Sequence, residues 1–320
     1  MPGLRAATPG GFAAVTTGLI GSPPEALALA VSGGPDSLAL LLLGHAAFGG
    51  RVRALTVDHG LRAGSAGEAA MVAGICAGLG VPHATLHWEG CKPDANLQAA
   101  ARAARYRLMG EWCAAQGVPL LLTAHHADDQ AETLLMRLAR GSGVGLAGIR
   151  ARRDLGGGVT LLRPLLGVRR TALAEIVAIA GLTPVDDPAN RDARHDRTHA
   201  RALLAAVAWL DPVRLAASAE HLAQAGAALD WAANLAWDSR VEQCDGDLVV
   251  DATGLPDALR HRLATRALAG FGSAPDGPGV ARLIARVDAG QVATLGGVQG
   301  RGTGRWTFSR VGSRRNQRIR

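Results

Sequence analysis

The stretch from Ala26 to Leu43 constrains the fold more than any other part of the chain. Ala26–Val31 is a short apolar run bounded by prolines and glycines, which is typical of a buried strand. Ser37–Leu43 is rich in leucine and predicts the first turns of a buried helix. The polar turn between them reads SGGPDS. A strand, a tight glycine turn and a helix N-terminus together predict an anion site, because backbone N–H groups converge there and the helix dipole favours negative charge.

This turn follows neither common nucleotide-binding pattern, since no lysine comes after its glycines and the spacing is not GxGxxG. The glycines would let the backbone approach a phosphate closely. The alternative is an ordinary turn between a strand and a helix, with Asp36 or Ser37 as its cap. The candidate phosphate-binding residues are Ser32, Gly33, Gly34, Pro35, Asp36 and Ser37.

Strands and helices alternate through the first 180 residues. Strands are predicted over 51–57, 82–88, 118–123 and the start of 161–181, and helices over 67–80, 95–116, 128–140 and the rest of 161–181. This alternation predicts an α/β fold with a doubly wound parallel sheet. Ligands bind beyond the carboxyl ends of such strands. We therefore expect residues 32–37, 58–59 and 125–129 to converge in one crevice.

The character of the chain changes near residue 211. Residues 185–201 are dense in both charge signs, which indicates an ordered functional loop or a solvated linker. Helices are predicted over 213–237, 255–269 and 280–289, and the last twenty residues contain seven arginines and no acid. We predict an α/β domain over 1–210, a small, mainly helical domain over 211–300 and a basic tail over 301–320.

A second motif, HHADDQAET, begins at His125. Asp128 is predicted to cap the helix that follows, and Asp129 and Glu132 share one face of it. Such carboxylates suit Mg²⁺ on phosphates, or a substrate ammonium group. His125 or His126 could carry protons or stabilise charge on phosphate. The alternative is an acidic first turn that only complements the helix dipole.

Asp36 stands inside the predicted phosphate turn, where an acid is unfavourable unless a cation lies beside it. We therefore predict that Asp36 contacts magnesium or a cationic substrate, and that Asp128 is a second magnesium ligand. Asp58 ends the strand over 51–57, where the adenosine of a nucleotide would lie.

The chain carries a net charge of +7, and Lys92 is its only lysine. Arginine suits bidentate phosphate contacts, and a basic balance suits a polyanionic partner; genome base content is the alternative cause. Arg105, Arg197 and Arg201 are candidate contacts to ATP or RNA. Trp88 is expected in the core.

Several classes of protein are disfavoured. The four cysteines form no CxxC pair, which argues against a structural zinc site, an iron–sulfur cluster and a disulfide framework. No apolar run reaches the length of a membrane span. We expect a soluble, cytoplasmic protein.

Six stretches together resemble the tRNA(Ile)-lysidine synthetase family, a branch of the ATP pyrophosphatases. They are SGGPDS (32–37), VDHGLR (57–62), NLQAAARAARYRLM (96–109), TAHHADDQAETLLMRLARGSG (123–143), RPLLGVRR (163–170) and DDPANRDARHDRTHAR (186–201). Two positions depart from the family, which often has arginine where His199 stands and serine where Ala189 stands. About 110 residues follow the last stretch, fewer than in long family members.

The resemblance implies an ATP-dependent ligase. ATP, with Mg²⁺, would adenylate the oxygen on carbon 2 of the wobble cytidine in the CAU-anticodon tRNA(Ile). L-lysine would then displace AMP, and the codon read would change from AUG to AUA. The domain over 211–300 would bind tRNA or substrate. The oligomeric state stays open, with a homodimer as one alternative.

The resemblance also implies roles for individual residues. Residues 32–37 and Asp58 would bind ATP, and Asp36, His125, Asp129 and Glu132 would serve catalysis and lysine binding. The rival functions are another tRNA- or small-molecule-modifying ATP pyrophosphatase and a non-catalytic RNA-binding protein.

Overall fold

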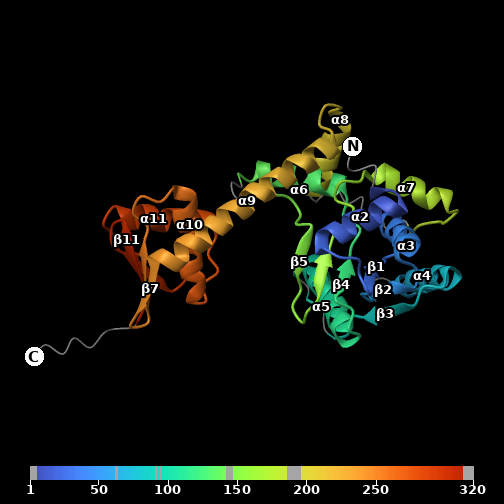
Figure 1. Ribbon diagram of the computed structural model, residues 1–320, viewed down its shortest axis with the longest axis horizontal. Coiled ribbons are helices and arrows are strands. Elements are labelled where there is room, and N and C mark those ends of the chain that lie inside the picture. The colour runs from blue at the N-terminus through green and yellow to red at the C-terminus, as the bar shows by residue number, and fades with distance from the viewer. Residues whose placement is uncertain are drawn as a thin grey trace, which may run out of the picture. The chain divides into compact units, whose positions relative to one another are not determined.

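The strand that leads into residues 32–37 belongs to a six-stranded sheet, and the helix that follows packs against this sheet (Figure 1). The computed structural model describes residues 6–61, 64–90, 92–93, 95–141, 147–185 and 196–312. The chain divides into two units, Met1–Ala223 and Gln224–Arg320.

The sheet of the first unit has the strand order β3-β2-β1-β4-β6-β5. Its first five members in this order are parallel, and β5 is an antiparallel edge strand. The strands are β1 (Leu27–Ala30), β2 (Val52–Asp58), β3 (His83–His87), β4 (Leu120–Leu122), β5 (Arg152–Asp154) and β6 (Thr160–Leu162). The predicted doubly wound parallel sheet is therefore confirmed.

Helices connect and cover these strands. They are α2 (Pro9–Ile20), α3 (Pro35–Phe48), α4 (Ser65–Leu79), α5 (Leu97–Ala115), α6 (Ala127–Ala139), α7 (Arg170–Ile179) and α8 (Asp196–Ala206). From β1 the chain builds outward through β2 and β3, and β4 then returns to the other side of β1. Such a reversal is where doubly wound sheets bind ligands.

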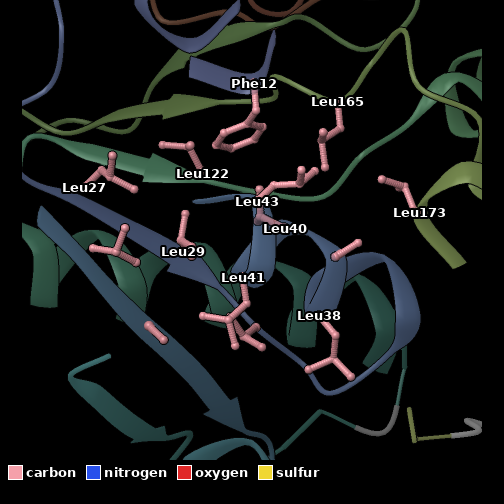
Figure 2. Packing of buried hydrophobic residues seen from close by; sticks show 14 of the residues in the cluster. Phe12, Leu27, Leu29, Leu38, Leu40, Leu41, Leu43, Leu122, Leu165 and Leu173 are labelled. Atoms are coloured by element: carbon pink, nitrogen blue, oxygen red, sulfur yellow. The ribbon is translucent and has the colours of Figure 1, made fainter. Parts of the chain in front are cut away.

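The core lies on both faces of the sheet because side chains alternate along each strand. Leu27 and Leu29 pack with α3 and with Phe12 of α2, as Figure 2 shows. Ala28 points to the other face and packs with α5. Leucine and valine dominate both clusters, so this aromatic-poor chain builds its core from aliphatic side chains.

The second unit combines helices with an antiparallel sheet of order β7-β8-β11-β10-β9. Its elements are α9 (Pro212–Arg240), β7 (Val241–Cys244), β8 (Asp247–Asp251), α10 (Asp257–Gly270), α11 (Gly277–Asp288), β9 (Ala293–Leu295), β10 (Val298–Arg301) and β11 (Arg305–Arg310). Trp306 and Phe308 are fully buried in its core. The Trp306 indole donates to Asp288 Oδ1 over 2.9 Å, and Arg260 pairs with the other oxygen of Asp288.

The helices expected in the C-terminal region are present, but the sequence analysis missed this sheet. Residues 305–310 of the expected tail form β11, which pairs with both β8 and β10. The division between the units lies inside α9, beyond the boundary predicted near Asp211. Part of the expected loop over 185–201 is helical, since α8 begins at Asp196; residues 186–195 lie outside the described residues. No described helix is long and apolar enough to span a membrane.

Candidate active site

Gly33 gives the turn after β1 its shape. Its φ is +85°, and a Cβ atom there would lie 3.0 Å from the side chains of Met71 and Val185. Any other residue would therefore meet both a strained backbone and a crowded space. The carbonyl of Gly33 also accepts a hydrogen bond from the Val185 amide, so the turn is fixed against a distant segment.

Ser37 closes the turn on itself. Its hydroxyl accepts from the Ser32 amide over 3.1 Å and donates to the Gly34 carbonyl over 2.9 Å. Gly34 is the N-cap of α3 and Pro35 stands in its first turn. Helix α3 thus begins inside the turn, and amides in a first helical turn have no partner within the helix. The predicted strand, glycine turn and helix N-terminus are therefore present, and an N-terminus of this kind is suited to an anion.

Asp36 joins the turn to the loop after β4. Its Oδ2 atom lies 3.5 Å from Nε2 of the buried His126. Its Oδ1 atom is buried and has no hydrogen-bond partner. A buried carboxylate oxygen without a partner is unfavourable unless a cation or a donor from a ligand satisfies it.

His126, and not Asp128, caps α6. The His126 backbone is extended, its Nδ1 atom accepts from the Asp129 amide, and Asp129 Oδ2 accepts from the His126 amide. The predicted cap was therefore wrong, because Asp128 already stands inside the helix. Asp128 instead accepts from the Arg170 amide over 2.8 Å and lies 3.4 Å from Arg169 Nε.

The pKa values of the adjacent histidines His125 and His126 are shifted in opposite directions. Burial lowers the pKa of His126, but a hydrogen bond to Asp36 and the charges of Asp129, Asp36 and Asp128 outweigh burial, so the pKa is raised. Burial lowers the pKa of His125 to about 3; the charge of Asp129 opposes this shift, and the charges of Arg163, Arg102 and Arg197 act in the same direction as burial. His125 is therefore neutral at pH 7, with its Nδ1 atom 2.9 Å from Thr123 Oγ1.

Glu132 is buried and held by two arginines of α8. Arg201 Nε lies 2.6 Å from Oε1, and Arg197 Nε lies 3.6 Å from Oε2. Burial raises the pKa of Glu132, and the Arg201 hydrogen bond offsets this only in part. Arg197 and Arg201, which the sequence suggested as contacts to ATP or RNA, here face a carboxylate.

Asp58 lies at the end of β2 and has its own set of contacts. Hydrogen bonds from Ser65 and the Gly60 amide lower its pKa. His59 beside it is 3.4 Å from Arg105 Nη2, and burial, reinforced by the Arg105 charge, lowers its pKa to about 4. In the described part of the chain, none of the contacts of Asp58 reaches Asp36 or His126.

Trp88 does not belong to the core clusters, contrary to expectation. Its ring contacts His59 edge to face at 5.8 Å, and Lys92 Nζ lies 5.6 Å from its centre. Lys92 also donates to the Gly60 carbonyl over 3.2 Å. A half-exposed aromatic surface with basic neighbours thus borders the end of β2.

Sequence reasoning missed Arg163. It directly follows β6 at the carboxyl end of the sheet, and it is 4% exposed. Its Nη1 atom donates to the Arg150 carbonyl over 2.6 Å, while its Nε atom is buried without a partner. The signal was present, because an arginine that follows a buried strand on the ligand-binding edge is a site candidate.

The groups that could bind an anion and the groups that could bind a cation lie in different parts of the site. The turn over 32–37 offers donors for an anion, and Asp36, Asp128 and Asp129 surround His126 with negative charge. Among the described residues, no three His, Cys, Asp or Glu side chains form a metal site by themselves. Mg²⁺ commonly takes one or two carboxylates and completes its shell with phosphate oxygens and water, so the unpartnered Asp36 oxygen fits it. Asp128 fits less well, because protein donors already reach both of its oxygens.

Comparison with known proteins places these residues in a family context. Residues 13–207 match the PP-loop domain family. The tRNA(Ile)-lysidine synthase of Novosphingobium aromaticivorans is 46% identical over 301 residues, which cover 92% of each chain. The tRNA(Ile)-lysidine synthase of Zymomonas mobilis is 44% identical over 305 residues, which cover 93% of this chain and 92% of the relative.

A solved structure is similar in fold. The U34-tRNA thiolase NcsA from Methanococcus maripaludis matches with a TM-score of 0.55, over 62% of this chain and 72% of its own. Its sequence identity is 16%, so this similarity concerns the fold alone.

Proposed function

Because the chain belongs to the tRNA(Ile)-lysidine synthase family of PP-loop enzymes, we propose that it ligates L-lysine to carbon 2 of the wobble cytidine in the CAU-anticodon tRNA(Ile). The chain is thus an ATP-dependent ligase that forms lysidine in tRNA. The reaction yields AMP and diphosphate, and it converts the tRNA from reading AUG to reading AUA.

The chemistry needs activation because the oxygen on carbon 2 of cytosine is a poor leaving group. That oxygen attacks the α-phosphorus of ATP, the bond to diphosphate breaks, and AMP becomes attached to the base. The side-chain amine of lysine then attacks carbon 2, loses a proton, and AMP leaves with the oxygen. The wobble base must leave its stack to react, which is easiest in a single-stranded anticodon loop.

The unpartnered Asp36 oxygen beside the phosphate turn is the observation that carries this proposal. Residues 32–37 hold the diphosphate part of ATP, and Asp58 faces its adenosine. Asp36 holds Mg²⁺, which offsets phosphate charge when bound. The neutral His125 donates a hydrogen bond from Nε2 to the α-phosphate, while Thr123 donates to Nδ1.

The amine of lysine needs acid nearby and a base to take its proton. Asp129 and Glu132 supply both, since they lie on one face of α6. Arg197 and Arg201 contact ATP or tRNA after lysine draws Glu132 away from them. Arg105 and the other surface arginines add salt-dependent affinity for tRNA.

AMP formation from ATP tests the proposal, with L-lysine and CAU-anticodon tRNA(Ile) each added or omitted. We expect AMP only with tRNA, and labelled lysine in the tRNA. AMP without tRNA, or lysine that never enters it, would instead indicate a small-molecule-modifying ATP pyrophosphatase.

A further inference from the structure

Three arginines surround one tyrosine at the edge of the proposed site. Arg102 and Tyr106 stand one turn apart on α5, and Arg153 comes from β5. The guanidinium carbons of Arg102 and Arg153 lie 5.2 Å and 5.9 Å from the centre of the Tyr106 ring. Tyr106 is also close enough to the Arg163 side chain to favour its charged form, which opposes the lowering of the Arg163 pKa by burial. We call these four residues the Tyr106 cluster.

The strand pattern explains why Arg163 joins this cluster. Val159, just before β6, and Leu161 within it are buried in the same cluster as residues of α5. Side chains two residues apart share a face of a strand, so Arg163 points toward α5 as well. Its amide donates to the Ala151 carbonyl, which fixes it against the segment leading into β5.

The Tyr106 cluster has an excess of positive charge. Within the described residues, no Asp or Glu pairs with Arg102, Arg153 or Arg163. A buried guanidinium is unfavourable without an anionic partner, and the nearby like charges add to the penalty. An arginine offers a planar fork that matches a carboxylate or a phosphate. The unpartnered Arg163 Nε atom therefore indicates a site for an oxyanion.

The position of His125 relates this site to the reaction. His125 follows β4 and Arg163 follows β6, and these two strands pair through Leu122 and Leu162. The charges of Arg163 and Arg102 lower the pKa of His125, and the charge of Asp129 raises it. A basic group and an acidic group are therefore close enough to His125 to act on its charge. Free lysine has the matching character, with an amine at the end of its side chain and a carboxylate at its backbone.

We propose that Arg163, supported by Arg102 and Arg153, binds the carboxylate of the lysine substrate; this inference rests on the proposed function. The phosphates of ATP are assigned to residues 32–37. An RNA backbone phosphate is too bulky to reach a guanidinium that is 4% exposed. A fixed length of methylene groups separates the carboxylate of lysine from its amine, so binding the carboxylate also positions the amine that attacks carbon 2.

The test compares L-lysine with 1,5-diaminopentane, which has the amine but no carboxylate, as acceptors for activated tRNA. We expect the wild type to prefer lysine strongly in kcat/KM. Arg163→Gln should lower kcat/KM for lysine by about 10- to 100-fold and leave that for the diamine unchanged. Arg102→Gln, on an exposed side chain that the fold does not need, should show the same selectivity with a smaller loss.

Arg152→Gln is the matched control, because this exposed neighbour lies on the opposite face of β5. It should change neither value. Thermal unfolding and tRNA-dependent diphosphate release without lysine verify that each variant is folded and activates tRNA. Equal losses for lysine and the diamine, or a weakened affinity for tRNA with unchanged selectivity, would overturn the carboxylate site. Absence of lysine transfer by the wild type would instead reject the proposed function.

Discussion

Glu132 in the first unit and Asp288 in the second are both held by arginines, and their surroundings differ. Glu132 is almost fully buried, but its partners Arg197 and Arg201 reach solvent. Asp288 is itself partly exposed, and its partners Arg260 and Trp306 are fixed in the core of the second unit.

Glu132 and Asp288 also differ in the charges of their other neighbours. Glu132 lies near the acid Asp129, which together with burial raises its pKa. Both oxygens of Asp288 are satisfied, and the Arg260 guanidinium also stacks on the Trp306 ring at 5.1 Å. Glu132 has a raised pKa and partners that reach solvent, which is typical of a carboxylate that also binds a ligand. Asp288 has partners fixed in the core, which is typical of an ion pair that stabilises the fold.

The largest effect should come from Asp36, which pairs with His126 and, among the described residues, with no arginine. Asp36→Asn should reduce AMP formation by roughly 10²- to 10³-fold, because the charge facing the phosphates is lost. The fold should persist with at most a small loss of thermal stability, since asparagine keeps an oxygen that can accept from His126 Nε2 and the Oδ1 atom of Asp36 has no hydrogen-bond partner among the described residues. Glu111→Gln, in an exposed pair with Arg107, is the control and should keep full activity.

Glu132→Gln tests the contacts of Glu132 with Arg197 and Arg201. Loss of the charge should reduce lysine transfer by roughly 10²-fold. The free energy of unfolding should also fall by about 1–3 kcal/mol, because Arg197 and Arg201 lose the carboxylate that links α6 to α8. Measured lysine incorporation and thermal unfolding should therefore both change. A variant that loses stability alone would assign Glu132 to the scaffold with Asp288.

Asp288→Asn is the matching change in the second unit. It should lower the free energy of unfolding by about 1–3 kcal/mol, since Arg260 loses the nearer of its two acidic partners and keeps only Asp257 at 3.5 Å. Lysine transfer at saturating tRNA should stay within twofold of the wild type. A large loss of turnover at a temperature where the variant is folded would show that Asp288 also serves the reaction, which would contradict its assignment to the fold alone.

His125 should give the smallest effect, as a pH dependence. Its pKa is about 3 in the folded protein and near 6.5 when unfolded. Between these values the unfolded chain binds a proton that the folded chain does not, so stability falls as the pH falls below about 6.5. From pH 7 to pH 5.5 the wild type should lose about 1 kcal/mol more than His125→Gln. Unfolding of both proteins at the two pH values measures this, and equal losses would contradict it.

The sequence predicted those parts of the molecule that depend on local signals. The strand, glycine turn and helix around residues 32–37 follow from neighbouring residues, and so does the alternation that gives the parallel sheet. The approach of Asp36 to His126 followed from a general rule, because the ends of β1 and β4 meet at one edge. The roles of the site residues remain proposals.

The missed sheet of the second unit had a local signal that went unused. Asp245 and Gly246 both have positive φ and join β7 to β8, and Gly296 and Gly297 do the same for β9 and β10. Such pairs are typical of two-residue hairpins. The strands themselves are short and polar, so their hydrophobic pattern is weak. The pairing of Glu132 with Arg201 had no local signal, because 69 positions separate the two residues.

The single lysine of this arginine-rich protein gives it a natural labelling position. Lys92 Nζ lies beside Trp88 and the Gly60 carbonyl, next to the end of β2 where the adenosine of ATP is proposed to lie. Apart from the α-amino group, an amine-reactive fluorophore would therefore modify one side chain, without any engineered cysteine. Its emission, and the quenching by Trp88, would change when nucleotide occupies that edge, so the chain carries its own position for an optical reporter of ATP binding.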